Sequence, residues 1–477
     1  MFAGMETNTP IDRAEAAISD TAAAGREHRW LTLTTLCLAV LVAQIDTAVV
    51  HLATHAIGDH LRTGINALQW IVDSYNLVYA VLLLTSGLLA DLYGRRRIFM
   101  AGAGIFTAAS LLCAAAPSTS ILIAGRALAG LGAGLFLPAS LAIIRMVWPE
   151  PVEHGRVLGI WAACNGLATA IGPTLGGLLI DRFGWRSIFL VVVPIIMVAL
   201  MLAFQSVPES SDPQGRHFDG VGQLLGATAL GGFALAAIQS REAPLLAIVA
   251  FIAAVLALAL FIRVEKRKGQ AALVPLDLFR SPTFCGAATA TAGMTFGMYG
   301  VLFLLPLVWL GTGRLDAFGA GLALVPMALV FVAVSPFSSV LTERYGTRPA
   351  VAGGVAIIGG GLLLIGAGTD AASIVPSEVG LMLTGLGMGL ATGPLMGTAV
   401  GAVPAARSGT ASALINAVRM VGATIGVAIL GAFFAMVGGG TSGLRTAMFA
   451  GGAIQIACAA IAWRAMRPPR VAWRASQ

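Results

Sequence analysis

The sequence predicts an all-α integral membrane protein with fourteen transmembrane helices. Of its 477 residues, 57% are hydrophobic and only 11% are charged, whereas a soluble domain carries about 25% charged residues. Uncharged runs, such as residues 98–124 and 245–262, recur along nearly the whole chain. These runs meet the roughly 20 residues that a helix needs to cross a bilayer. A soluble globule is excluded, because the chain has too little polar surface to cover one.

The apolar runs set the spans, and the charges between them set the orientation. We expect spans at residues 31–55, 68–90, 98–116, 120–144, 156–180, 186–204, 219–239, 244–263, 283–309, 319–341, 348–368, 374–399, 409–436 and 444–464. This even number puts both termini on one side. Most of the 29 Lys and Arg residues fall in the tails and loops of that side, which the positive-inside rule assigns to the cytoplasm. The net charge of +7 forms no contiguous basic face, so nucleic acid is not an expected partner.

Two longer loops divide the chain into parts. Between them lies a two-helix insert over 219–263, with a six-helix bundle before it over 31–204 and a second six-helix bundle after it over 283–464. At the two ends of the chain we expect a disordered cytoplasmic tail over 1–30 and a tail over 465–477. A weak repeat relates the two bundles. With an offset of 252, Asp91 matches Glu343 and Gly94 matches Gly346, each pair lying after the second helix of its bundle. Parallel repeats of this kind are typical of transporters that bind substrate between the halves.

Several motifs resemble those of the major facilitator superfamily, specifically its fourteen-helix drug:proton antiporter branch. They cover nearly the whole chain in order: Asp46-Thr47-Ala48-Val49-Val50, Gly87-Leu-Leu-Ala-Asp91-Leu-Tyr-Gly94-Arg95-Arg96-Arg97, Arg126 with Gly130 and Gly132, Gly172-Pro173-Thr-Leu-Gly176-Gly177, Gly184-Trp185-Arg186 with Phe189 and Pro194, and Gly409 with Asn416, Arg419 and Gly422. The second motif lacks the Arg that usually follows its Asp. The resemblance implies the major facilitator fold, a transporter of the bacterial inner (plasma) membrane, and export of small lipophilic molecules, drugs or antibiotics in exchange for protons.

Two acids lie well inside predicted spans, Asp46 in the first and Asp73 in the second. Charge at membrane depth is costly, so such residues are functional by default. At 1.5 Å per residue, both acids and Arg126 lie at a similar depth in the outer half of the first bundle. A carboxyl that meets Arg126 in one conformation only would change its proton affinity during transport. We expect Asp46 to be the main proton carrier and Asp73 a substrate contact or second carrier. The alternative is a static Asp–Arg pair that only orients helices.

Two motifs suggest moving parts. Gly87, Asp91, Gly94, Arg95 and Arg96, with Glu343 of the repeat, form a candidate conformational gate whose charges pair in one state and separate in the other. They could instead simply hold a loop in the cytoplasm.

The antiporter motif contains Gly172, Pro173, Gly176 and Gly177. Its small residues allow close helix contact, and its proline kinks the helix. The resemblance implies an interface with the opposite half and the direction of antiport. Generic helix packing would explain the same residues.

Candidate substrate contacts are His51, Trp70, Met298, Asn416 and Arg419. His51 stands where the branch usually has Asn, and it could assist Asp46. His51, His55 and Asp59 are spaced by four and could share a metal ion, but no fourth ligand is evident, so we expect no metal. The five cysteines are scattered without CxxC spacing, which predicts small buried side chains. We expect no cofactor beyond the proton gradient.

The leading hypothesis is a proton-coupled antiporter that works by alternating access. An exporter dedicated to one endogenous metabolite, such as an antibiotic, a siderophore or a lipid-like product, is the alternative. A membrane enzyme would need a nucleophile–base or metal constellation, and neither HExxH nor GxSxG occurs. Small molecules, protons and lipid are the expected partners, and a monomer suffices for this architecture.

Overall fold

The computed structural model describes residues 10–211, 219–269, 272, 274–371, 373–403 and 408–466, and these form helices without a strand. The helices are α1 (Pro10–Leu61), α2 (Ile65–Tyr93), α3 (Arg95–Ala115), α4 (Thr119–Val147), α5 (Pro151–Phe183), α6 (Ser187–Ser206), α7 (Gly220–Ile238), α8 (Pro244–Lys268), η2 (Leu276–Arg280), α9 (Pro282–Gly311), α10 (Ala317–Val334), α11 (Phe337–Tyr345), α12 (Thr347–Ala367), α13 (Val375–Gly401), α14 (Ser408–Met436) and α15 (Gly440–Ala465).

The helices confirm the predicted all-α membrane architecture. In the described part of the chain, thirteen helices are long and apolar enough to cross a membrane, and fourteen if the bent α2 counts as one span. The predicted span 319–341 is divided between α10 and the short α11.

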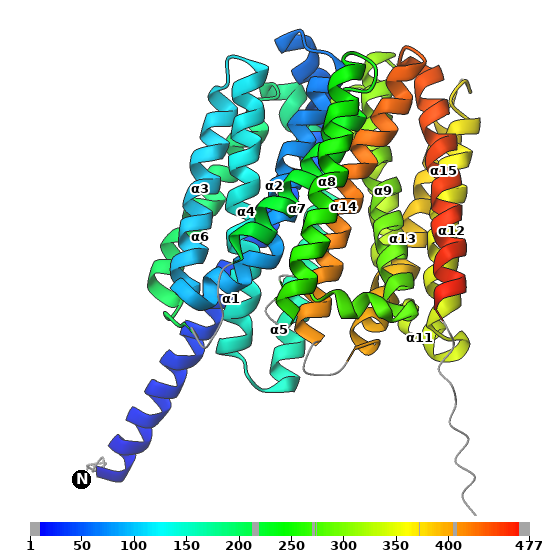
Figure 1. Ribbon diagram of the computed structural model, residues 1–477. Helices are drawn as coiled ribbons and strands as arrows, with labels where there is room; N and C mark the ends of the chain where they lie inside the picture. The colour runs from blue at the N-terminus through cyan, green and yellow to red at the C-terminus, as the bar shows by residue number, and fades with distance from the viewer. Residues whose placement is uncertain are drawn as a thin grey trace, which may run out of the picture.

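The two bundles stand side by side, with α7 and α8 in front of α2 and α14 (Figure 1). We call α1–α6 the N-terminal half and α9–α15 the C-terminal half. α7 contacts α8 and also α2 and α14, which belong to different halves and contact each other. The face that carries the loop between α2 and α3 is named the Gly94 face, and the opposite one, with the loop between α1 and α2, the Gly64 face.

The repeat is visible in the backbone and the packing. Gly94 and Gly346 both have positive φ, 105° and 86°, and both end the second span of their half. Gly102 packs on the backbone of Gly132, and Gly354, at the same offset of 252, packs on the backbone of Gly387. Small residues let these neighbouring helices approach closely.

The N-terminal region differs from the prediction. We expected a disordered tail over residues 1–30, but α1 begins at Pro10 and reaches Leu61 as one helix of 52 residues. Its first turns project away from the bundle (Figure 1). The physical reason is composition, because this segment is rich in Ala with Glu and Arg, which are strong helix formers. Residues 1–9 of the predicted N-terminal tail and 467–477 of the predicted C-terminal tail lie outside the described residues.

Candidate functional site: a buried ion pair and the seam between the halves

A buried ion pair joins α1 to α4. The Arg126 Nη1 donates to Asp46 Oδ2 at 2.6 Å, and both side chains are almost fully buried. The Arg126 Nε also donates to the backbone carbonyl of Ile71 on α2 at 3.2 Å. Its guanidinium lies over the ring of Tyr75, 4.5 Å from the centroid. The cation therefore links three helices of the N-terminal half.

Glycine on α4 makes this arrangement possible. A methyl group added at Gly130 would come within 2.5 Å of the Tyr75 carbonyl oxygen. Without a side chain there, α4 lies directly against α2 and brings Arg126, one turn earlier, to the carbonyl of Ile71. The Arg126–Gly130 spacing of the sequence motif thus serves both charge and close packing.

Asp73 does not join the pair. Its side chain is fully buried, and neither carboxyl oxygen has a hydrogen-bond partner among the described residues. The sequence put Asp46, Asp73 and Arg126 at one depth, and the structure brings together only Asp46 and Arg126. A carboxyl group without partners in a membrane core is costly, which marks Asp73 as a second candidate site.

His51 lies where the two halves meet. It is buried, its ring makes an edge contact with Tyr299 of α9 at 5.7 Å between centroids, and neither ring nitrogen has a hydrogen-bond partner in the described part of the chain. His55 instead pairs with Asp59, Nδ1 to Oδ2 at 3.2 Å. The described residues contain no group of three His, Cys, Asp or Glu side chains that could hold a metal ion.

The other candidate substrate contacts are more scattered. Met298 is partly buried on α9, and Asn416 donates to the carbonyl of Ser412 in its own helix at 3.1 Å. The Arg419 Nε is buried without a hydrogen-bond partner among the described groups. Trp70 is half-buried on α2. Of these candidates, His51 is the one for which the structure shows a contact with the opposite half, through the ring of Tyr299.

The antiporter motif lies at the crossing of α5 with α1 and α10. Gly172 and Gly176 pack against Ala48 and Val49 of α1, whereas a side chain at Gly177 would overlap the backbone of Ala317 in the opposite half. Conversely, a side chain at Gly321 of α10 would overlap the carbonyl of Pro173. Asp181, near the end of α5, accepts a hydrogen bond from the amide of Phe318 at 2.8 Å.

The loop between α2 and α3 contains the gate candidates. Asp91 pairs with Arg95, Oδ1 to Nη2 at 2.9 Å. Gly94 adopts φ 105°, a conformation that favours glycine. Arg96 donates to the Phe204 carbonyl at 2.7 Å and lies over the ring of that residue. Gly87 has open space around its Cα, and Glu343 is exposed near the end of α11.

Glu209 holds this loop, and the sequence did not single it out. Its carboxylate accepts from the amide of Arg96 at 3.2 Å and lies 3.6 Å from the Arg97 Nε. The amide of Arg95 also donates to the carbonyl of Ser210 at 2.8 Å. The sequence did contain a signal for it, because Glu209 is an acid just past the end of α6, and the loop after α2 has three consecutive arginines that need a partner.

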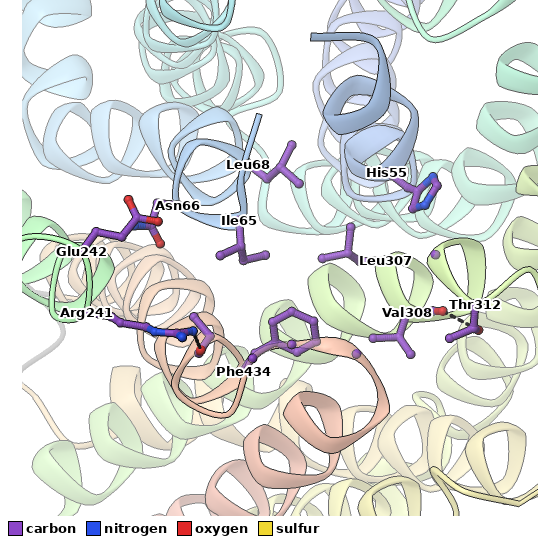
Figure 2. A pocket seen from close by; sticks show the side chains of 15 residues that line it. His55, Ile65, Asn66, Leu68, Arg241, Glu242, Leu307, Val308, Thr312 and Phe434 are labelled. Atoms are coloured by element: carbon purple, nitrogen blue, oxygen red, sulfur yellow. Dashed lines mark hydrogen bonds between the residues drawn. The ribbon is translucent and has the colours of Figure 1, made fainter. Parts of the chain in front are cut away.

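A cavity of about 730 Å³ opens at the Gly64 face between the two halves. Figure 2 shows His55, Ile65 and Leu68 of the N-terminal half facing Leu307 and Phe434 of the C-terminal half. The loop between α7 and α8 completes the rim, where Arg241 donates to the carbonyl of Ala435 on α14. Sequence reasoning identified only His55 in this region.

The contacts described between the halves gather toward the Gly64 face. Besides Asp181 with Phe318, Gln69 near the start of α2 donates to the carbonyls of Val427 and Ala428 near the end of α14, at 3.0 Å each. Gly311, at the end of α9, packs against His55. These contacts join the halves at this face, beside the cavity. Gln69 was also missed, since it is uncharged and belongs to none of the sequence motifs.

Comparison with known proteins gives one family. The model of the Major Facilitator Superfamily matches residues 36–218 and 216–427. The chain is 36% identical over 405 residues to the multidrug resistance protein Stp of Mycobacterium tuberculosis, covering 84% of this chain and 75% of that protein. It is 33% identical over 423 residues to a probable actinorhodin transporter of Streptomyces coelicolor, covering 85% and 72%. A bacterial homologue of the human lysosomal transporter Spinster, solved inward-facing and unoccupied, has a TM-score of 0.67 at 18% identity, covering 92% and 97%.

Proposed function

The chain belongs to the Major Facilitator Superfamily, and from that premise we propose that it exports drug-like small molecules in exchange for protons. It is a multi-pass protein of the bacterial inner membrane and a transporter rather than an enzyme. Relatives named for multidrug resistance and multidrug efflux support drug export as its activity. Proton coupling and alternating access are the finer parts of the proposal.

The buried Asp46–Arg126 pair is the observation that carries proton coupling. A carboxylate and a guanidinium that are both out of water stabilise each other only while they remain in contact. If Asp46 moves away from Arg126, it is left as a buried unpaired charge, which a proton neutralises. Contact and protonation are therefore alternatives for Asp46.

Packing links this exchange to the movement of the halves. α1 carries Asp46, and it packs against Gly172 and Gly176 of α5. α5 in turn contacts α10 of the opposite half through Gly177 and Asp181. Opening the Gly64 face must separate α5 from α10, and α1 lies directly behind that contact. We propose that this movement pulls Asp46 from Arg126, while Asp73 acts as a second proton site or contacts the substrate.

Orientation follows from the positive-inside rule. We propose that both termini and the Gly94 face are cytoplasmic, so that the joined Gly64 face makes this an inward-facing conformation. The gate motif around Asp91 and Glu343 would then lie at the cytoplasmic entrance. One chain contains both halves and the seam between them, so we propose a monomer as the functional unit.

Antiport can be tested in liposomes that contain the purified protein, with the pH indicator pyranine trapped inside. An imposed pH gradient is followed while ethidium (a lipophilic cation), chloramphenicol (neutral) or fluorescein (an organic anion) is added in turn. We expect at least one class to trigger proton flux. Asp46→Asn should abolish this flux, because an amide cannot take up a proton when residue 46 moves away from Arg126.

The matched control is Asp59→Asn, an acid on the same helix whose carboxylate is exposed and pairs with His55. It should transport like the wild type. Proton flux that survives in Asp46→Asn would remove Asp46 as the carrier, and the same assay with Asp73→Asn would then identify the alternative. Solute movement without proton movement in the wild type would contradict coupling itself.

An exporter dedicated to one endogenous metabolite is the second candidate. The relative named as a probable actinorhodin transporter, a name that specifies a single compound, favours it. The same liposomes distinguish the two, because a multidrug exporter responds to several of the three probes and a dedicated exporter to none or one.

A further inference from the structure

α2 is sharply bent on its way to the gate motif. Its segments Ile65–Leu83 and Thr85–Tyr93 meet at 58°, although α2 contains no proline. Bends of this size without proline arise where a side chain interrupts the helical hydrogen bonds or at Gly/Ser pairs. The segment beyond the bend, which we call the α2 arm (Thr85–Tyr93), carries Asp91 and leads directly into Gly94.

A glutamine from the two-helix insert lies at this bend. The Gln223 carboxamide of α7 donates to the carbonyl of Val81 and accepts from the hydroxyl of Thr85. In a regular helix, the Val81 carbonyl would accept from the amide of Thr85, four residues on. One side chain of α7 thus bonds both residues that frame the break in α2.

The surroundings of α7 single out this contact. The only polar side chains within α7 are Gln223 and Thr228, and Thr228 is exposed and donates to the carbonyl of Leu224 in its own helix. α7 lies against both α2 and α14, at the seam between the halves, and Gly231 contacts Leu77 of α2. An interhelical carboxamide inside an otherwise apolar helix is costly to leave unpaired in a membrane.

We propose that Gln223 is a positioning residue of transport, through which the two-helix insert clamps α2 in its bent form. The bend sets where the α2 arm, and with it Asp91 and Gly94, lies at the Gly94 face. Straightening α2 would move Val81 and Thr85 relative to α7, and this would break both bonds of Gln223. The insert therefore favours the present conformation, with the halves joined at the Gly64 face, over one in which α2 is straight.

The test uses the full chain with its five cysteines replaced by serine and with spin labels at Val152→Cys and Tyr345→Cys. Both positions are exposed and lie in opposite halves at the Gly94 face. Pulsed electron paramagnetic resonance gives the distribution of distances between them. We expect Gln223→Leu to shift this distribution toward shorter distances. Its maximal rate of export should change by about three- to tenfold, the range for loss of a hydrogen bond between membrane helices, with KM little altered.

Thr85→Val removes the hydroxyl on the α2 side and should cause part of the same shift. The double variant should not exceed Gln223→Leu by more than a small margin, because both changes act on one contact. Thr228→Val, on the same helix, is the matched control and should behave as the wild type. Ser86→Ala removes a second possible cause of the bend, since the Ser86 hydroxyl donates to the carbonyl of Leu82 at 2.7 Å.

A Gln223→Leu variant whose distances and rate equal those of Thr228→Val would overturn the proposal. Additive effects of Gln223→Leu and Thr85→Val would overturn it too, because Gln223 would then act elsewhere. If Gln223→Leu fails to fold, the test rests on Thr85→Val. A distance distribution that Thr85→Val leaves unshifted would then count against the proposal. The distance measurement does not depend on protons, so loss of coupling would leave it interpretable.

Discussion

At the scale of single residues, Gly130 fixes the distance between α4 and α2. A methyl group at this position would come within 2.5 Å of the Tyr75 carbonyl oxygen, and that atom belongs to a backbone that cannot rotate away. We expect Gly130→Ala to push the helices apart and lengthen the bond from Arg126 to Ile71. The free energy of unfolding should fall by about 1–3 kcal/mol, as in other overpacked cores.

The measurement is the melting temperature in detergent, where Gly130→Ala should unfold at a lower temperature than the wild type. Gly104→Ala on α3 is the control, because a methyl group there meets no atom within 4 Å. It should melt at or slightly above the wild-type temperature, since alanine is the better helix former. Equal melting of the two variants would show that α4 can move at no cost.

The residues of the ion pair could be found from the sequence, but not their partnership. Asp46, Asp73 and Arg126 stand out because charge is rare in apolar spans. Depth along a helix follows from residue number, whereas the direction in which a side chain points depends on how each helix is rotated in the bundle. The structure turns Asp46, and not Asp73, toward Arg126. Gln69 carries no charge and was passed over, and Gln223 was given no role, although a carboxamide inside a span is also a signal.

At the scale of elements, the base of the insert is held by Asp219 and Lys268. Asp219 begins α7, where its carboxylate accepts from the amide of Gly222 at 2.8 Å and pairs with Lys268 at the end of α8. Burial raises the pKa of Asp219, but the hydrogen bonds from Lys268 and from the Gly222 amide outweigh it, so the pKa lies below the ordinary 3.8. The ionised form is therefore favoured by folding.

From this follows a pH-dependent prediction. Because the folded pKa of Asp219 lies below its unfolded value, its ionised form adds stability above pH 3.8, and this stability is lost as the pH falls through the lowered pKa. Asp219→Ala should cost about 1 kcal/mol at pH 7 through loss of the helix cap. Asp219→Asn should cost less, since it keeps an acceptor and loses only the ion pair. The difference in melting temperature between Asp219→Asn and the wild type should become smaller in acid. A difference that does not depend on pH would show that the Asp219–Lys268 ion pair does not stabilise the fold.

The number and order of helices could be predicted, while their shape could not. Apolar length predicted the spans, and each corresponds to one helix in the structure, except that 319–341 is divided between α10 and α11. The bend of α2 escaped prediction because α2 contains no proline, and the side chain that bonds Val81 and Thr85 beside the bend comes from α7, more than a hundred residues away in sequence. The early start of α1 at Pro10 was missed because polar composition was taken to exclude helix, although Ala and Glu favour one.

At the scale of the whole molecule, the repeat explains why two halves exist but not how they are placed. Gly94 and Gly346 serve the same turn in both halves, so the sequence contains the symmetry. In alternating access, the same sequence adopts two arrangements of the halves, one open to each side of the membrane. The sequence motifs do not indicate which of the two arrangements the structure has. The contacts of Gly177, Asp181 and Gln69 join the halves at the Gly64 face. These contacts must break and reform in each transport cycle if the proposed mechanism holds.

Tying the halves together at this face should therefore stop transport. The Asp181 carboxylate and the Phe318 amide are 2.8 Å apart, so Asp181→Cys with Phe318→Cys, on a background without the native cysteines, can be joined by a short bifunctional maleimide containing a cleavable disulfide. We expect export in liposomes to cease on cross-linking and to return on reduction. The control joins His60→Cys to Arg186→Cys, which lie 3.1 Å apart between the His60 Nε2 and the Arg186 Nη1 but belong to the same half. That cross-link should leave export intact, because it does not tie one half to the other. Full export with the 181–318 link in place would mean that the Gly64 face never opens between α5 and α10, and substrate would then have to leave by another route.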